Sequence, residues 1–270
     1  MKVFDCFLYF DEDFLLNVRL NILNNYVDYF VIVEGNKTWQ NNHKDFNFDL
    51  NKFSQFKEKI IYLKVDEFPD SPNPWIRENY QRNYILKGLN IAKNDDLIIV
   101  SDLDEIPNPK KITSFKAKDR FAVFKQKLFY YKFNLQNKTH PSWLGSRICV
   151  KKFLKSPQWL RNLKFKKRPF WRFDKLRLNN IIENGGWHFC NLKSSEQILY
   201  KYKNLCETDD QFFTKSKINE KYLNLTEINR RISSGKDIIG RNHDFEKISL
   251  NADFPEYILQ NKNKFSEWIL

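Results

Sequence analysis

The chain has 270 residues, near the upper limit for one hydrophobic core, so we predict a single domain. Hydrophobic residues make up 41% of the chain and aromatic residues 16%, a composition that excludes an intrinsically disordered or collagen-like protein. The net charge of +13 favours a nucleic acid, an anionic membrane or a phosphate-rich small molecule as partner, although biased genome composition can also enrich lysine.

The first hundred residues alternate short apolar runs with helical patterns, which predicts an α/β fold with a mostly parallel central sheet flanked by helices. We expect strands at Val3–Phe10, Tyr29–Glu34, Lys59–Val65 and Leu97–Val100, and helices at Phe14–Asn24 and Trp75–Ile91. Asp11 and Asp13 are available to cap the first helix.

The pattern changes after Pro109. Arg120–Phe133 alternates aromatic residues with lysine, which indicates exposed or antiparallel strands. The stretch 151–177 is strongly basic, and the glycines at 185 and 186 interrupt the chain before Trp187. From Ser194 onward the pattern predicts a largely helical C-terminal part.

The cysteines and the first residues bear on the cellular compartment. No two cysteines form a C-x-x-C pair, which excludes a zinc knuckle and predicts free thiols in a reducing cytosol. The four are Cys6, Cys149, Cys190 and Cys206. Met1–Tyr9 contains a lysine and an aspartate, so we interpret it as a buried strand and not as a signal peptide. We therefore expect a cytoplasmic protein whose membrane contact, if any, is peripheral.

Two aspartates follow the strand at Leu97–Val100. In an open α/β sheet, ligands bind at the carboxyl edge of the strands. If the backbone stays extended there, Asp102 and Asp104 share one face and converge on a cation, while Glu105 turns away. Mg²⁺ or Mn²⁺ at this position would neutralise a departing nucleoside diphosphate. Alternatively, the acids only end the strand and cap a turn.

Several segments resemble glycosyltransferase family 17, the bisecting β-1,4-N-acetylglucosaminyltransferase-like family, in its bacterial and viral branch. The resemblance lies in residues 75–83 (WIRENYQRN) and 95–107 (DDLIIVSDLDEIP), and also in 4–7, 28–34, 185–189 and 228–241. It implies a GT-A type fold in a single catalytic domain over 1–270, with a nucleotide-sugar half at 1–110 and an acceptor half at 111–270. It also implies a UDP-sugar donor, UDP-N-acetylglucosamine, a divalent cation, and inversion at the anomeric carbon.

Three residues near the sheet edge are candidates for donor contacts. Glu34 ends a strand and could accept hydrogen bonds from a nucleobase or ribose, or else cap a turn. Arg77 and Arg82 lie on the predicted helix at 75–91, and both can lean toward the sheet edge to bind phosphate. Either arginine could instead pair with Glu78 or remain solvated.

The Gly-Gly-Trp-His-Phe segment supplies further candidates. His188 could complete the metal site beside Asp104, as the resemblance suggests, or be a core histidine. Trp187 and Trp143 could stack on a sugar ring or simply fill the core. For an inverting transfer we choose Asp209 as the general base.

The base assignment has alternatives, since acids in a helical tail are commonly solvated. Asp210 is the reserve, and Glu207 and Glu183 are further candidates. Segment 206–210 departs from the pattern that the resemblance leads us to expect, so the base is not carried over from the family.

The basic stretch 151–177 interleaves aromatic residues with its charges, a pattern also found in nucleic-acid binders. In a glycosyltransferase it would suit docking on an anionic membrane that holds a lipid-linked acceptor, or binding a phosphorylated glycan; a plain basic surface is the other interpretation. We expect no nucleic acid, and a bacterial surface polysaccharide or lipooligosaccharide as acceptor. A metal-dependent nuclease or nucleotidyltransferase and a non-catalytic glycan-binding module remain as rival functions.

Overall fold

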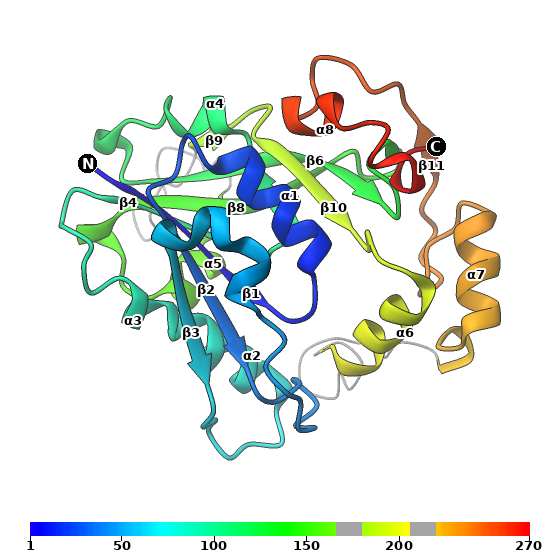
Figure 1. Ribbon diagram of the computed structural model, residues 1–270, viewed down its shortest axis with the longest axis horizontal. Coiled ribbons are helices and arrows are strands. Elements are labelled where there is room, and N and C mark those ends of the chain that lie inside the picture. Colours follow the sequence, from blue (N-terminus) through cyan, green and yellow to red (C-terminus); the bar gives the residue numbers. More distant parts are fainter. Residues whose placement is uncertain (166–179, 206–219) are drawn as a thin grey trace, which may run out of the picture.

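The computed structural model describes residues 1–165, 180–205 and 220–270. They form a mixed β-sheet with helices on both faces, which confirms the predicted α/β class (Figure 1). The strands are β1 (Val3–Tyr9), β2 (Tyr29–Gly35), β3 (Ile60–Val65), β4 (Leu97–Ser101), β5 (Glu105–Pro107), β6 (Phe121–Tyr130), β7 (Leu135–Asn137), β8 (Ser142–Val150), β9 (Ile181–Ile182), β10 (Gly186–Cys190) and β11 (Phe245–Lys247). The helices are α1 (Asp13–Leu23), α2 (Pro74–Asn83), α3 (Ile85–Gly88), α4 (Pro109–Ile112), α5 (Pro157–Asn162), α6 (Ser195–Asn204), α7 (Leu225–Ser233) and α8 (Glu256–Gln260).

The first four strands run parallel, as the sequence pattern predicted, and the structure places them in the order β4-β1-β2-β3. Cys6 on β1 is aligned with Val31 on β2 and with Val100 on β4. All three side chains are fully buried. These strands are apolar along almost their whole length because helices cover both faces of the sheet.

The rest of the sheet is largely antiparallel, so the expected parallel order is confined to the N-terminal part. Strand β8 pairs antiparallel with both β4 and β6. The predicted antiparallel character of 120–133 is therefore confirmed, but the strand is not exposed: Phe121–Tyr130 is mostly buried. Strand β10 lies between β5, to which it is antiparallel, and β6, to which it is parallel.

Helices α1 and α8 cover one face of the sheet, where Leu16, Leu20 and Ile258 belong to one apolar core. Helices α2, α3 and α5 cover the other face, where Ile85 and Leu160 belong to a second core. The described part of the C-terminal region contains helices α6 and α7, side by side at the lower right of Figure 1, and also α8. Much of the rest is turn and loop, and it includes strand β11, so the expected largely helical character is met only in part. Among the described residues no helix is long and apolar enough to cross a bilayer.

Two local predictions are wrong. The helix expected over 75–91 is divided at Tyr84 into α2 and the single turn of α3. Helix α1 is preceded by Glu12, whose side chain makes no capping bond and instead accepts from the backbone N–H of Phe10 and Asp11. Asp13 accepts from the Tyr9 hydroxyl at 2.6 Å, so neither predicted aspartate caps the helix.

Candidate functional site

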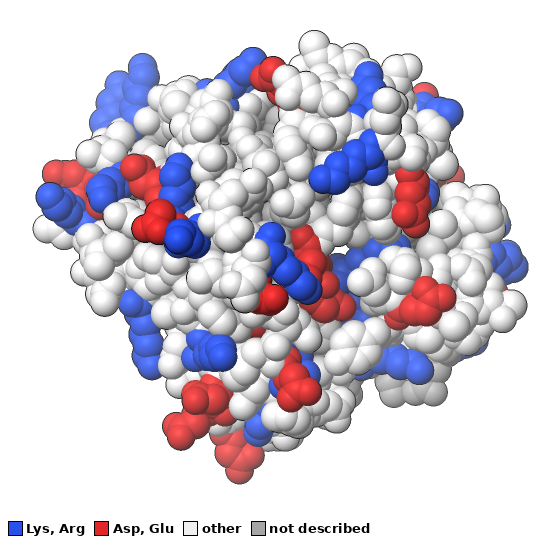
Figure 2. Space-filling view, in the orientation of Figure 1, with Lys and Arg blue, Asp and Glu red and all other residues white. Residues whose placement is uncertain are grey.

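A pocket of about 770 Å³ opens at the carboxyl ends of the parallel strands. One side is formed by the ends of β1 and β2 and by residues 102–104, and the other by β10 and α6. Acidic and basic side chains lie side by side near the middle of the face shown in Figure 2. On this face they are interspersed and form no continuous basic patch. The pocket thus brings mixed charge to the sheet edge at which the sequence predicted a ligand.

The acidic loop is a turn, so the expected extended backbone is wrong. The N–H of Glu105 donates to the carbonyl oxygen of Asp102 at 3.0 Å. Beneath the turn, Nη1 of Arg19 donates to the carbonyl oxygens of Asp102 (3.2 Å), Leu103 (3.0 Å) and Glu105 (2.7 Å). Arg19 is itself paired with Asp5 on β1, and both side chains are fully buried. The turn is therefore fixed from below, and its two aspartates face the pocket.

Asp102 is held by two arginines. Its carboxylate accepts from Arg82 at 3.0 Å and from Arg161 at 2.8 Å. Burial works against its charge, but Arg161 and Arg82 outweigh burial and lower the pKa of Asp102 below the usual value. Arg161 also donates to buried Glu105 at 2.7 Å, and Trp143 Nε1 donates to Glu105 at 2.8 Å. Glu105 thus turns into the protein and anchors the groups around the loop.

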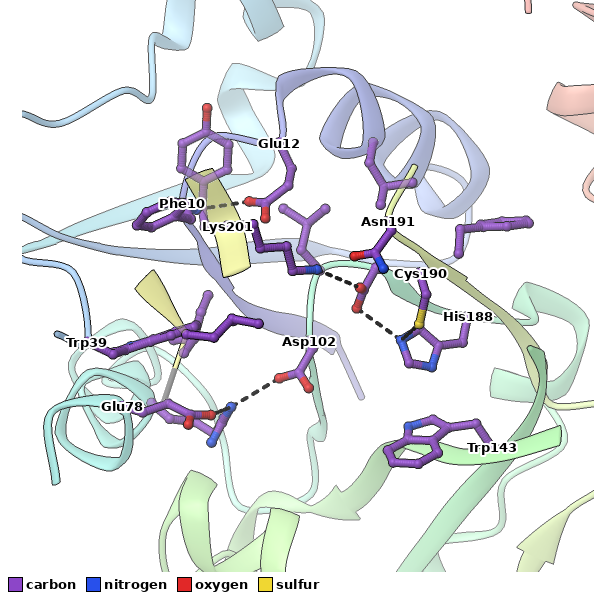
Figure 3. Close-up of a pocket in the computed structure, with 18 of the residues that line it drawn as sticks. Phe10, Glu12, Trp39, Glu78, Asp102, Trp143, His188, Cys190, Asn191 and Lys201 are labelled. Atoms are coloured by element: carbon purple, nitrogen blue, oxygen red, sulfur yellow. Dashed lines mark hydrogen bonds and ion pairs between the residues drawn. The ribbon is translucent and has the colours of Figure 1, made fainter. Parts of the chain in front are cut away.

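Asp104 meets a different set of partners. His188 Nε2 lies 3.3 Å from Oδ1 of Asp104, and Lys201 Nζ lies 3.7 Å from Oδ2. Burial would raise the pKa of Asp104, but His188 and Lys201 lower it far below the usual range. Cys190 Sγ is 3.1 Å from His188 Nε2. In Figure 3 the side chains of His188 and Cys190 point toward one another, with Lys201 reaching in from the opposite side.

The predicted metal ligands are only partly brought together. Asp104, His188 and Cys190 each offer a donor atom, and these atoms lie within 4.8 Å of one another. Asp102 is not a member of this group and faces the arginines instead. One carboxylate, one imidazole and one thiol form a donor set that suits a divalent cation. His188 Nδ1 is buried without a hydrogen-bond partner in the described ranges, so only Nε2, which faces the cluster, orients the ring.

Glu34, predicted to contact the donor, does not line the pocket. Its fully buried carboxylate accepts from Lys44 Nζ at 2.5 Å and from the Tyr62 hydroxyl at 2.7 Å. The backbone N–H groups of Asn47 and Phe48 donate to it as well, at 2.7 and 3.1 Å. Glu34 therefore fixes the loop that follows β2.

Arg77 and Trp187 are likewise not among the residues that line the pocket. Arg77 is buried and donates to the backbone carbonyls of Trp39 and Ser71. Trp187 is buried in the apolar core, and its Nε1 donates to the Asp253 carbonyl at 3.1 Å. Both side chains stabilise the structure around the pocket through hydrogen bonds to backbone carbonyls.

The predicted general bases are not placed. Asp209, Asp210 and Glu207 lie outside the described residues, so their assignment stays a prediction. Glu183 is exposed, pairs with Lys125 and does not line the pocket. The part of the basic stretch from 166 to 177 also lies outside the described residues.

Several pocket residues were not identified as site residues from the sequence, among them Arg147, Arg161, Cys190 and Lys201. Arg161 belongs to the basic stretch, where Ser156 and Pro157 mark the start of α5 and could have placed it on a helix. Arg147 is on β8, and burial together with Arg161 lowers its pKa to about 10, so the guanidinium keeps its charge at neutral pH. Cys190 is two residues from His188, a spacing that puts both on one face of a strand.

An α/β sheet whose edge carries an aspartate turn, a cluster of possible metal ligands and several guanidiniums has the chemistry that suits a phosphate-bearing ligand. The sequence model of glycosyltransferase family 17 matches residues 1–269, and the chain belongs to this family. Its sheet with flanking helices is the architecture expected of the GT-A type fold.

The chain is similar to two mammalian proteins, both named beta-1,4-mannosyl-glycoprotein 4-beta-N-acetylglucosaminyltransferase. The Homo sapiens protein is 24% identical over 281 residues, which cover 93% of this chain and 52% of that protein. The Rattus norvegicus protein is also 24% identical, with 93% and 51% covered. The chain therefore spans about half the length of the curated relatives it matches.

Solved structures match more weakly. S. aureus TarS 1-349 is 14% identical, covers 86% of this chain and 72% of its own, and has a TM-score of 0.39. Glucosyl-3-phosphoglycerate synthase from Mycobacterium tuberculosis, in complex with Mn²⁺ and UDP-glucose, is 11% identical, covers 96% and 91%, and has a TM-score of 0.36.

Proposed function

We propose that the chain is an inverting, metal-dependent glycosyltransferase that moves N-acetylglucosamine from a UDP donor onto a glycan. The observation that carries this proposal is the acidic turn. It presents Asp102 and Asp104 to a pocket that Arg82, Arg161 and Lys201 also line. The names of the mammalian relatives support the sugar and the type of transfer.

The residues divide the work between charge and position. Asp104 and His188 would hold the cation, which supplies positive charge to neutralise the diphosphate as it leaves. Arg82 and Arg161 carry fixed positive charge beside Asp102, and their planar donor groups suit phosphate oxygens. Because these groups are already held by hydrogen bonds, little reorganisation is needed when the donor binds.

The acceptor side follows from the reaction type. A general base, for which Asp209 with Asp210 in reserve remains our choice, removes the proton of an acceptor hydroxyl. The oxygen then attacks the anomeric carbon from the face opposite the diphosphate, which inverts the configuration. We propose a bacterial surface polysaccharide or lipooligosaccharide, free or lipid-linked, as acceptor, and a cytoplasmic site of action.

The proposal is tested by donor binding and donor hydrolysis. UDP and Mn²⁺ together should raise the melting temperature more than either alone, and the protein should slowly hydrolyse UDP-N-acetylglucosamine. Asp104→Asn should abolish hydrolysis while the fold stays intact. Asp253→Asn is the matched control, because Asp253 is exposed, pairs with Lys127 and does not line the pocket. No thermal response to UDP with Mn²⁺ would refute the proposal.

The same assays address the rival functions. A non-catalytic glycan-binding module would show no donor hydrolysis in the unmodified protein. A two-metal nuclease needs a further carboxylate close to the aspartates. Glu105 is the nearest in sequence, but it is fully buried against Arg161 and Trp143. Family membership and this arrangement favour the glycosyltransferase.

A further inference from the structure

Cys190 lies beside the two residues that would hold the cation. Strand β10 is extended, so alternate side chains share a face. Trp187 and Phe189 belong to the apolar core, and Phe189 also reaches the pocket wall, whereas His188 and Cys190 line the pocket without belonging to that core. The Cys190 Sγ is 3.1 Å from His188 Nε2, the same nitrogen that faces Asp104.

Backbone pairing holds Asp104 against this pair. Strand β10 is antiparallel to β5, with His188 opposite Glu105. One step further along, the Phe189 N–H donates to the carbonyl oxygen of Asp104 at 2.9 Å. The backbone pairing of β10 with the acidic turn and β5 therefore holds the three donor groups close together. Lys201 approaches the other carboxylate oxygen of Asp104, which leaves Oδ1 facing His188.

We propose that Cys190 is a third protein ligand of the cation and that its thiolate makes the site select Zn²⁺ or Co²⁺ over Mg²⁺. This inference rests on the proposed function for the existence of a metal site. Thiolate is a soft ligand, whereas Mg²⁺ prefers carboxylate, carbonyl and water oxygens. On binding, the thiol releases its proton to solvent as the sulfur–metal bond forms. Imidazole also suits Zn²⁺ better than Mg²⁺, so a site of oxygen and imidazole alone would show this preference more weakly.

Cobalt spectroscopy tests the ligand directly, without nucleotide or turnover. Co²⁺ added to metal-free, reduced protein should give the near-ultraviolet band of thiolate-to-cobalt charge transfer. Cys190→Ala should lose the band and bind Co²⁺ at least about tenfold more weakly, since loss of even an indirect ligand partner costs that much. Cys149→Ala, which removes a buried thiol from the second core, should keep both. A band that survives in Cys190→Ala, or is missing in the unmodified protein, would overturn the proposal.

A second measurement needs no variant. Zn²⁺ should protect Cys190 from alkylation, as read from the labelled peptide by mass spectrometry, whereas Mg²⁺ at the same concentration should not. Equal protection by both ions, or by neither, would count against the thiolate ligand. If UDP and Mn²⁺ still stabilise the protein while these tests fail, only the role of Cys190 is lost. If UDP with Mn²⁺ did not raise the melting temperature at all, the proposed function itself would be refuted.

Discussion

Asp5 and Arg19 form an ion pair with both side chains fully buried, and the same guanidinium supports the acidic turn. Oδ1 and Oδ2 of Asp5 accept from Nη2 and Nε of Arg19 at 2.6 and 2.8 Å. Nη1 remains for the carbonyl oxygens of the turn. A strand and a helix from the first 25 residues therefore fix the position of Asp102 and Asp104.

We predict that Arg19→Met lowers the free energy of unfolding by about 3–5 kcal/mol, because it leaves the Asp5 charge buried without a partner. The variant should also lose its thermal response to UDP with Mn²⁺, since the carbonyl oxygens of the turn lose their donor. Urea denaturation of the unmodified protein and of Arg19→Met measures the change in the free energy of unfolding.

The control for this prediction is Lys52→Ala. Lys52 pairs with Asp13 at 2.6 Å, but both side chains are substantially exposed to solvent. Exposed pairs contribute little to stability because solvent screens them, so this variant should be close to the unmodified protein. If Arg19→Met were no less stable than Lys52→Ala, the buried pair would not stabilise the fold as predicted, and an unchanged thermal response to UDP with Mn²⁺ would show that Arg19 does not support the turn.

Gly186 on β10 is aligned with Pro107 on β5, where the two strands approach closely. Its φ is +133°, and an added Cβ would lie 2.1 Å from the Ile106 carbonyl oxygen. We expect Gly186→Ala to cost about 2 kcal/mol or more, because the strain and the clash can be relieved only by separating the strands. His188 would move with its strand, so Co²⁺ binding should weaken as well.

Gly235→Ala is the matched control for Gly186. Gly235 also has a positive φ, +59°, but nothing lies within 4 Å of its added Cβ. The left-handed conformation alone costs about 1–2 kcal/mol, and metal binding should not change. Equal loss of metal binding in both variants would show that the spacing of β10 and β5 is not what positions His188.

The parallel half of the fold could be predicted because β1, β2 and β4 are buried on both faces. Runs such as Leu97–Val100 then carry no polar residue, and the turn after them reaches the ligand edge. The antiparallel half was harder. Strand β6 mixes lysine with aromatic residues, but Lys125 and Lys127, in the middle of the strand, are half-buried and paired with Glu183 and Asp253, while the rest of the strand is buried. Which neighbour a strand of this pattern takes depends on contacts distant in sequence.

In the candidate site, too, contacts between residues distant in sequence could not be predicted. Asp102 and Asp104 were found because their position follows from local structure. The partners of those aspartates, Arg161 and Lys201, come from helices more than fifty residues away in sequence, and no local pattern connects them. Conversely, Glu34 ends its strand at the ligand edge, as a donor-binding residue would, but its carboxylate accepts hydrogen bonds from the loop after β2. Whether such a carboxylate faces a ligand or its own loop depends on tertiary packing.

Alanine variants of Trp143 and Trp187 should distinguish an effect on donor hydrolysis from an effect on stability. Trp143 lines the pocket and is 46% exposed, whereas Trp187 is 5% exposed in the core. Trp187→Ala should lower the free energy of unfolding by about 3–5 kcal/mol, as for other large core truncations. Trp143→Ala should cost less stability but reduce donor hydrolysis, because the ring beside His188 also donates to Glu105. A Trp143 variant with unchanged hydrolysis would contradict a role for this ring at the sugar.

Arg161 donates hydrogen bonds to both Asp102 and Glu105 at the acidic turn. Nη2 donates to Asp102 at 2.8 Å, and Nη1 donates to Glu105 at 2.7 Å. Lysine would keep the charge, but a single ammonium cannot reproduce this fork. We therefore expect Arg161→Lys to lose about 1.5–3 kcal/mol of unfolding free energy, the value of a hydrogen bond to a charged group.

Arg161→Lys should also weaken UDP binding in the presence of Mn²⁺ by roughly tenfold, which corresponds to about 1.4 kcal/mol. Isothermal titration calorimetry measures this effect. Arg230→Lys is the control, because Arg230 makes an exposed pair with Glu227 and does not line the pocket. If Arg161→Lys bound UDP as the control does, the arginines beside Asp102 would serve only to hold the turn. The diphosphate would then depend on Asp104 and its neighbours alone.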